Sequence, residues 1–253
     1  MNLERGLSKA VAHYGKTRSF QAANQGKGGN QDYKERASVT GGKQMDGFTH
    51  VLCDVIEQAG LHRTEIFRGK SIGEIPGFYR PTKNWDTIIV ADGKLVALIE
   101  LKSQMGPSFG NNFNNRVEEA LGNATDVWKA YAEKTFASSP RPWLGYLMLL
   151  EDCPESRGVK KVCEPHFPVR PEFRDERYAP GNHLAVSYAK RYELFCRKMM
   201  LDRLYDSACL ILSPRSQGMR GRFSEPATDL TFKAFAASLA GKAAEHVAKR
   251  EFK

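Results

Sequence analysis

The pattern of hydrophobic and polar positions predicts a mixed α/β protein. Apolar residues recur at helical spacing over 48–59, which indicates an amphipathic helix. Two β-favouring runs follow at 87–90 and 95–101, and Asp92-Gly93 between them is a strong hairpin turn signal. Because helices and strands alternate, we expect a mixed central sheet flanked by helices. Further along, the pattern predicts a helix over 116–134, a strand over 144–150, a helix with the stripe Tyr188, Tyr192, Phe195 and Met199, a strand over 208–212, and a last helix with Phe232, Phe235, Ala236, Leu239, Ala243 and Val247.

The length of 253 residues suits one large domain over 1–253. Residues 1–47 are rich in Gly, Gln and Asn, which favours an N-terminal arm or loop. A Pro-, Arg- and Glu-rich stretch over 153–181 separates the core from the later elements, and 153–253 is expected to form the basic C-terminal part of the same domain.

The net charge of +9 is unevenly distributed. Residues 61–154 hold 11 Lys and Arg against 11 Asp and Glu, whereas residues 155–253 hold 19 against 12. A gathered basic surface favours a polyanionic partner, and a solvated basic face without a partner is the alternative. The sequence shows no apolar run of about 18 residues, so we expect a cytoplasmic protein that does not bind a membrane. The scattered cysteines and histidines predict buried reduced thiols and no zinc site.

Three residues around the hairpin carry the candidate chemistry. Asp86 precedes the first strand and Glu100 closes the second, so their Cβ atoms should lie about 4.5 to 8 Å apart and could share one cation. Glu100 and Lys102 are two residues apart on a strand and point to the same face. The spacing alone is common, and a structural Glu–Lys pair at a strand end is the alternative.

The chemistry that suits this set is metal-assisted phosphodiester hydrolysis. Mg²⁺ prefers carboxylate oxygens, so Asp86, Glu100 and the backbone carbonyl of Leu101 are the expected ligands, and Lys102 would orient or deprotonate the water or stabilise charge on the phosphate. A third acid from the 48–59 helix, Glu57 or Asp54, is a weaker candidate, with a solvated surface carboxylate as the alternative.

An aspartate before the hairpin and Glu-x-Lys at its end resemble the PD-(D/E)XK nuclease core, although Trp85 stands where proline is usual. The stretches 39–46, 76–86 and 187–212 further resemble the XhoI family of type II restriction endonucleases. The resemblance implies a bacterial or archaeal homodimer that cuts double-stranded DNA at palindromic CTCGAG and leaves 5′ overhangs. It also implies a cognate DNA methyltransferase as a genetic partner only.

Candidate DNA contacts follow from the chemistry of base and phosphate recognition, in which Arg suits guanine and Asn or Gln suits adenine. The 111–116 loop combines Asn with Arg, with a polar turn as its alternative, and the 213–225 loop is rich in Arg. Solvated lysines are the alternative for Lys43 and Lys83. The full set is Lys43, Lys83, Asn111, Asn112, Asn114, Asn115, Arg116, Arg215, Gln217, Arg220 and Arg222.

Two other functions remain open at this point. A structure-directed or repair nuclease would use the same three catalytic residues and a basic surface. A non-catalytic DNA-binding protein that inherited the fold would have little reason to keep Asp86, Glu100 and Lys102 together.

Overall fold

The computed structural model describes residues 2–25, 43–62, 65–67, 73–164 and 166–251. Its central sheet has the strand order β1-β4-β5-β6-β9. The strands β4 and β5 are antiparallel, whereas β5, β6 and β9 run parallel. Their bounds are β1 Ile66–Phe67, β4 Thr87–Ala91, β5 Lys94–Gln104, β6 Trp143–Glu151 and β9 Ser207–Ser213.

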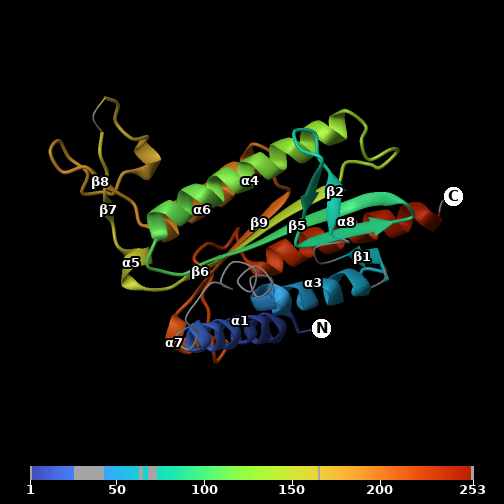
Figure 1. Ribbon diagram of the computed structural model, residues 1–253, viewed down its shortest axis with the longest axis horizontal. Coiled ribbons are helices and arrows are strands. Elements are labelled where there is room, and N and C mark those ends of the chain that lie inside the picture. Colours follow the sequence, from blue (N-terminus) through green and yellow to red (C-terminus); the bar gives the residue numbers. More distant parts are fainter. Residues whose placement is uncertain (1, 26–42, 63–64, 68–72, 165, 252–253) are drawn as a thin grey trace.

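Helices cover both faces of this sheet (Figure 1). One face packs against α1, α3 and α8, and the other against α4 and α6, so the sheet separates two hydrophobic cores. A 3-10 turn, η1 (Lys43–Met45), leads directly into α3. The helix bounds are α1 Leu3–Gln25, α3 Asp46–Gln58, α4 Phe109–Ala132, α6 Tyr188–Leu201 and α8 Phe232–Glu251.

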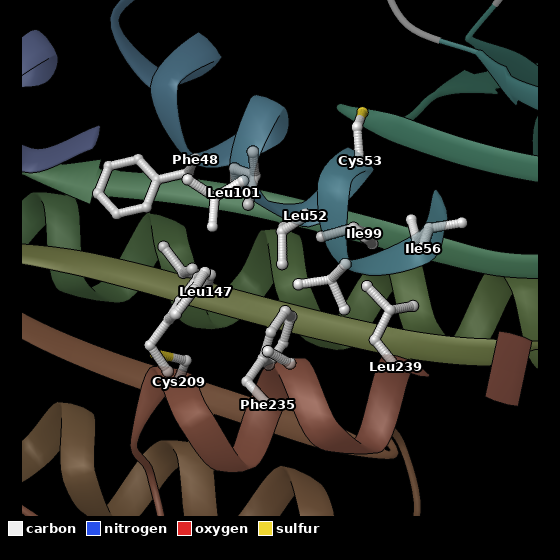
Figure 2. Close-up of a cluster of buried hydrophobic side chains, with 14 of the residues drawn as sticks. Phe48, Leu52, Cys53, Ile56, Ile99, Leu101, Leu147, Cys209, Phe235 and Leu239 are labelled. Carbon is white, nitrogen blue, oxygen red and sulfur yellow. The ribbon is translucent and has the colours of Figure 1, made fainter. Parts of the chain in front are cut away.

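Alternation along β5 decides which residues enter each core. Ile99 and Leu101 lie in the core that includes Phe48 and Leu52 of α3 (Figure 2). Leu98 lies in the opposite core with residues of α4 and α6. Successive strand residues point to opposite faces, so Glu100 faces α4. The register therefore places one buried carboxylate beneath a helix.

Two smaller hairpins extend from the core. The first pairs β2 (Glu74–Pro76) with β3 (Thr82–Asn84) immediately before Asp86. The second belongs to an excursion between β6 and α6 that stands away from the sheet in Figure 1. It contains α5 (Pro154–Arg157), β7 (Lys160–Lys161), η3 (Pro171–Phe173) and β8 (Leu184–Ala185).

The elements expected in the middle and at the end of the chain are confirmed, with shifts of a few residues at their ends except at the start of α4. The turn Asp92-Gly93 has φ of 53° and 68°, the left-handed conformation that a tight two-residue hairpin requires. Tyr192, Phe195 and Met199 are buried in the core, as the helical stripe predicts.

The expectation of an N-terminal arm over 1–47 is wrong where the structure describes it. Residues 3–25 form α1, because Leu7, Ala10, Val11 and Tyr14 make a buried stripe at helical spacing. This stripe stabilises the helix despite its polar composition. Residues 26–42 of the expected arm lie outside the described residues.

The loop expected at 111–116 is also wrong, because α4 already begins at Phe109. Phe109 is buried and stacks on Tyr188 of α6 with ring centroids 5.8 Å apart, so tertiary packing overrides the weak helix propensity of asparagine. The 213–225 loop contains a short helix, α7 (Arg215–Gly218). Among the cysteines, Cys163 is exposed, contrary to the expectation of buried thiols. No helix in the described ranges is long and apolar enough to span a membrane.

Candidate active site

The β4–β5 hairpin brings the three predicted catalytic residues together. Thr87 pairs with Ile99, and the same register carried one residue outward sets Asp86 beside Glu100. The backbone N–H of Leu101 donates to Oδ2 of Asp86 at 2.7 Å. Lys102 Nζ lies 2.5 Å from Oε1 of Glu100. The predicted convergence of Asp86, Glu100 and Lys102 is therefore present in the fold.

Glu100 is fully buried, yet its two oxygens have unequal surroundings. Oε1 is close to Lys102 and accepts a hydrogen bond from Nδ2 of Asn123 at 3.2 Å. Oε2 has no hydrogen-bond partner, and the nearest ion-pair partner is Lys83, whose Nζ is 3.6 Å away. An unpaired buried carboxylate oxygen is costly, so this arrangement suits a site that takes up a cation.

The electrostatics of the site point the same way. Burial, followed by the negative charge of Glu100, raises the pKa of Asp86 to about 6. Burial lowers the pKa of Lys102, but the charges of Glu100 and Asp86 outweigh it, and the pKa is raised overall. Two mutually repelling carboxylates beside a protonated lysine form a donor set that fits a hard divalent cation. The structure supports a cationic Lys102 rather than one that deprotonates water.

A polar cleft of about 390 Å³ opens in front of these residues. Asp86, Lys102 and the backbone segment through Leu101 form one wall. Asn112 and Arg116 of α4 form another, so two of the predicted DNA contacts face the site. The N-terminal part of the chain adds three side chains that the sequence did not suggest, namely Tyr14, Arg18 and Gln44.

The remaining predicted DNA contacts are placed differently. Asn111, Asn114 and Asn115 are exposed on α4 and do not line the cleft. Arg215 pairs with the buried Glu151, Nε to Oε1, at 2.9 Å. It lines a cavity of about 260 Å³ that shares Tyr14 and Arg18 with the cleft. Gln217, Arg220 and Arg222 are exposed nearby, and the side chain of Lys43 lies outside what the structure describes.

The tentative third acid does not join the site. Glu57 and Asp54 belong to α3, which packs on the opposite face of the sheet from Glu100. The described residues contain no group of three or more His, Cys, Asp or Glu side chains placed to hold one metal ion. The nearest further acid is Glu119 of α4, with Oε2 3.7 Å from Nζ of Lys102.

Sequence reasoning pointed to Arg116 but missed Glu119 and Asn123 of α4. Arg116, Glu119 and Asn123 recur at spacings of three and four, so they share one face of the helix. Arg116 pairs with Glu119 at 2.6 Å, and Asn123 reaches Glu100. The recurrence of these polar residues on one face of α4 was the signal in the sequence that could have indicated their role at the site.

The same helix holds the tip of the β2–β3 hairpin. Asp126 accepts hydrogen bonds from the backbone N–H groups of Phe78 and Tyr79, each at 2.8 Å, and pairs with Nε of Arg80 at 2.8 Å. Arg80 Nη2 also donates to Oδ1 of Asn123 at 3.2 Å, which leaves the Asn123 amide nitrogen for Glu100. The hairpin and the catalytic strand are thus joined through α4.

Comparison with known proteins identifies the family. The model of the restriction endonuclease XhoI family matches residues 24–225. The chain belongs to the XhoI family of type II restriction endonucleases. The type II restriction enzyme BstVI of Geobacillus stearothermophilus is 50% identical over 214 residues, which cover 83% of this chain and 91% of that enzyme.

Two further relatives support the assignment. The type II restriction enzyme AbrI of Azospirillum brasilense is 46% identical over 164 residues, which cover 65% of this chain and 73% of AbrI. The type II restriction enzyme XhoI of Xanthomonas vasicola is 44% identical over 168 residues, which cover 66% of this chain and 64% of XhoI. No solved structure matches the chain. The expected restriction-endonuclease-like fold and the class of site-specific deoxyribonuclease are confirmed, and double-stranded DNA is the substrate.

Proposed function

We propose that this restriction endonuclease cleaves both strands of the palindrome CTCGAG in a Mg²⁺-dependent reaction and leaves 5′ overhangs. The observation that carries the proposed chemistry is the convergence of Asp86 and Lys102, which line the cleft, with the buried Glu100 directly behind them, whose Oε2 has no hydrogen-bond partner. Membership of the XhoI family supports the proposed target, because CTCGAG is the usual target of that family and one relative, 44% identical over 168 residues, is the type II restriction enzyme XhoI.

Each residue of the site has a proposed task. Asp86, Glu100 and the carbonyl of Leu101 would hold the cation, which when bound polarises the scissile phosphate and lowers the pKa of the attacking water. Lys102 would donate from its ammonium group to a phosphate oxygen or orient that water. Asn112 and Arg116, which line the cleft, would contact DNA beside the scissile bond.

A homodimer would match the symmetry of the target. A palindrome presents the same half-site twice, so two copies of the chain related by a two-fold axis would place one active site on each strand. A cognate methyltransferase would protect the host DNA as a genetic partner, without contact to this chain.

The test is digestion of a plasmid with a single CTCGAG site in the presence of Mg²⁺ or EDTA, followed by sequencing of the ends. Metal-dependent cutting at that site with 5′ overhangs is the expected result. Cutting at another sequence would reject the target but keep the enzyme class. A matched plasmid with one base pair of the site changed serves as the control.

A further inference from the structure

The two oxygens of Glu100 differ in how firmly their partners are held. At Oε1, Lys102 stands at 2.5 Å and the amide of Asn123 at 3.2 Å, and Lys102 is also within 3.7 Å of Glu119. At Oε2, Lys83 stands at 3.6 Å, close enough for an ion pair but without a hydrogen bond. Oε2 is therefore the oxygen of Glu100 that still lacks a hydrogen-bond donor.

Lys83 comes from a different element from the rest of the site. It lies on β3, in the small β2–β3 sheet outside the central sheet, and its side chain is 20% exposed. It has other partners at hand, since its Nζ donates to the backbone carbonyl of Asn84 and lies 5.3 Å from the centre of the Trp85 ring. Lysine has a flexible stem, so Nζ can leave Glu100 without moving the strand.

We propose that Lys83 is the resident counter-ion of Glu100, which neutralises the Oε2 side until a divalent cation takes that place and frees the lysine for a DNA phosphate. This inference rests on the proposed metal site. A buried carboxylate needs a compensating charge whenever the cation is absent, and Lys83 provides it at the unpaired oxygen.

Charge repulsion favours displacement of the Lys83 ammonium when a divalent cation binds. A cation such as Mg²⁺ binds carboxylate oxygen at about 2.0–2.1 Å, so it would stand within a few ångströms of the present Lys83 ammonium. Two positive groups about 4 Å apart repel each other, and they do so more strongly near a protein surface than in bulk water. Lys102 has two acidic partners, Glu100 and Glu119, and is the less easily displaced of the two lysines.

The experiment compares Lys83→Met with the wild-type enzyme for binding of Mn²⁺ alone, without DNA, by electron paramagnetic resonance. Because the competing charge is removed, we expect Mn²⁺ to bind roughly fivefold more tightly. Single-turnover cleavage at saturating Mn²⁺ should fall roughly tenfold, because the variant has no ammonium group at position 83 to contact the DNA phosphate. Opposite signs in the two measurements are the signature of the exchange.

Lys129→Met is the matched control, because it removes the same charge from the exposed side of α4, where Lys129 pairs with Glu133. It should leave Mn²⁺ affinity unchanged. Unchanged or weaker Mn²⁺ binding by Lys83→Met would overturn the inference while leaving the metal site intact. Glu100→Gln separates the two ideas: if it leaves Mn²⁺ binding at the wild-type level, the proposed metal site fails and the exchange fails with it.

Discussion

A carboxylate on α4, Asp126, and one on the strand beneath it, Glu100 of β5, are almost equally buried, yet their surroundings are opposite. Asp126 is 3% exposed and has three N–H donors, each at 2.8 Å. Burial raises the pKa of Asp126, but these donors outweigh it and hold the pKa below its usual range. Glu100 is 0% exposed and keeps one oxygen unpaired, and the pKa of its neighbour Asp86 is raised to about 6.

The difference distinguishes Asp126, a carboxylate with a structural role, from Glu100, a carboxylate with a proposed role in metal binding. Asp126 has its full set of donors and fixes the β2–β3 hairpin to the helix. Glu100 and Asp86 repel each other, and Oε2 of Glu100 has no hydrogen-bond partner, which is the arrangement expected where a protein binds a metal for catalysis. Asn123 lies between the two acids and contacts both sides, through Arg80 and through Glu100.

Loss of the charge on Glu100 should have the largest effect on activity. Glu100→Gln keeps the shape of the side chain but removes a proposed metal ligand, so we expect cleavage to fall by about three orders of magnitude. Single-turnover cleavage of the target plasmid measures this effect. DNA affinity measured in EDTA should stay within a few fold of wild type, and a cleavage loss of less than tenfold would contradict the proposed role.

Loss of Asp126 should instead affect the fold. Asp126→Ala leaves three donors without their partner, so we expect the free energy of unfolding to fall by about 2–4 kcal/mol. Thermal melting should show this as a decrease in Tm of about 2–4 °C for each kcal/mol. Glu133→Ala removes an exposed carboxylate from the same helix and should change the free energy of unfolding by less than about 0.5 kcal/mol. If Asp126→Ala abolished cleavage without lowering Tm, the comparison would be wrong.

The site of Asp86, Glu100 and Lys102 could be predicted from the sequence, whereas the hydrogen-bonded site of Asp126 could not. The Asp92-Gly93 turn sets the hairpin, and its register alone would place Asp86 opposite Ile99. A β-bulge between Ile89 and Val90 shifts the register by one residue and brings Asp86 opposite Glu100. These contacts are local in the chain, so pattern and turn chemistry could predict the pairing to within one residue, but not the bulge. The superfamily resemblance rests on the same residues.

The contacts of α4 could not be predicted in this way, because they join elements far apart in the chain. Asn123 and Glu100 are 23 residues apart, and Asp126 and Phe78 are 48 apart. The helix α1 and the first turns of α4 were not predicted from the sequence, for a related reason. Their polar composition favours loops, and it is burial of residues such as Leu7 and Phe109 that makes them helical.

Two arginines extend the comparison to DNA binding. Arg116 lines the cleft, whereas Arg80 is bound to Asp126. Arg116→Ala should reduce the slope of log affinity against log salt by about one unit, as loss of one phosphate contact does. Arg80→Ala should leave that slope unchanged and lower Tm instead. Titration of the target duplex in EDTA over a range of salt concentrations measures both, and equal slopes for the two variants would count against a cleft that binds phosphate.

The smallest effect is a pH dependence of opposite sign at the two sites. The folded-state pKa of Asp86, about 6, lies above the ordinary aspartate value of 3.8, so its protonated form contributes stability that is complete below about pH 4 and lost as the pH rises through 6. Asp86→Asn removes that titration and should stabilise the metal-free protein above pH 6. Because the Asp86 side chain lines the open cleft, solvent reaches part of the carboxyl group and weakens the effect of burial, so the gain should be about 1 kcal/mol or less.

Asp126→Asn should behave in the opposite way, because the pKa of Asp126 is lowered by its donors after burial has raised it. A lowered pKa contributes stability above about pH 4 that is lost as the pH falls, so this variant should be destabilised at pH 8 and approach wild type in acid. Urea unfolding in EDTA between about pH 2.5 and 8 measures both variants, because the Asp86 effect changes between about pH 4 and 6 and the Asp126 effect changes below about pH 4. If the two variants showed the same dependence of the free energy of unfolding on pH, Asp86 would have a lowered pKa like that of Asp126. The negative charge of Glu100 would then not raise the pKa of Asp86.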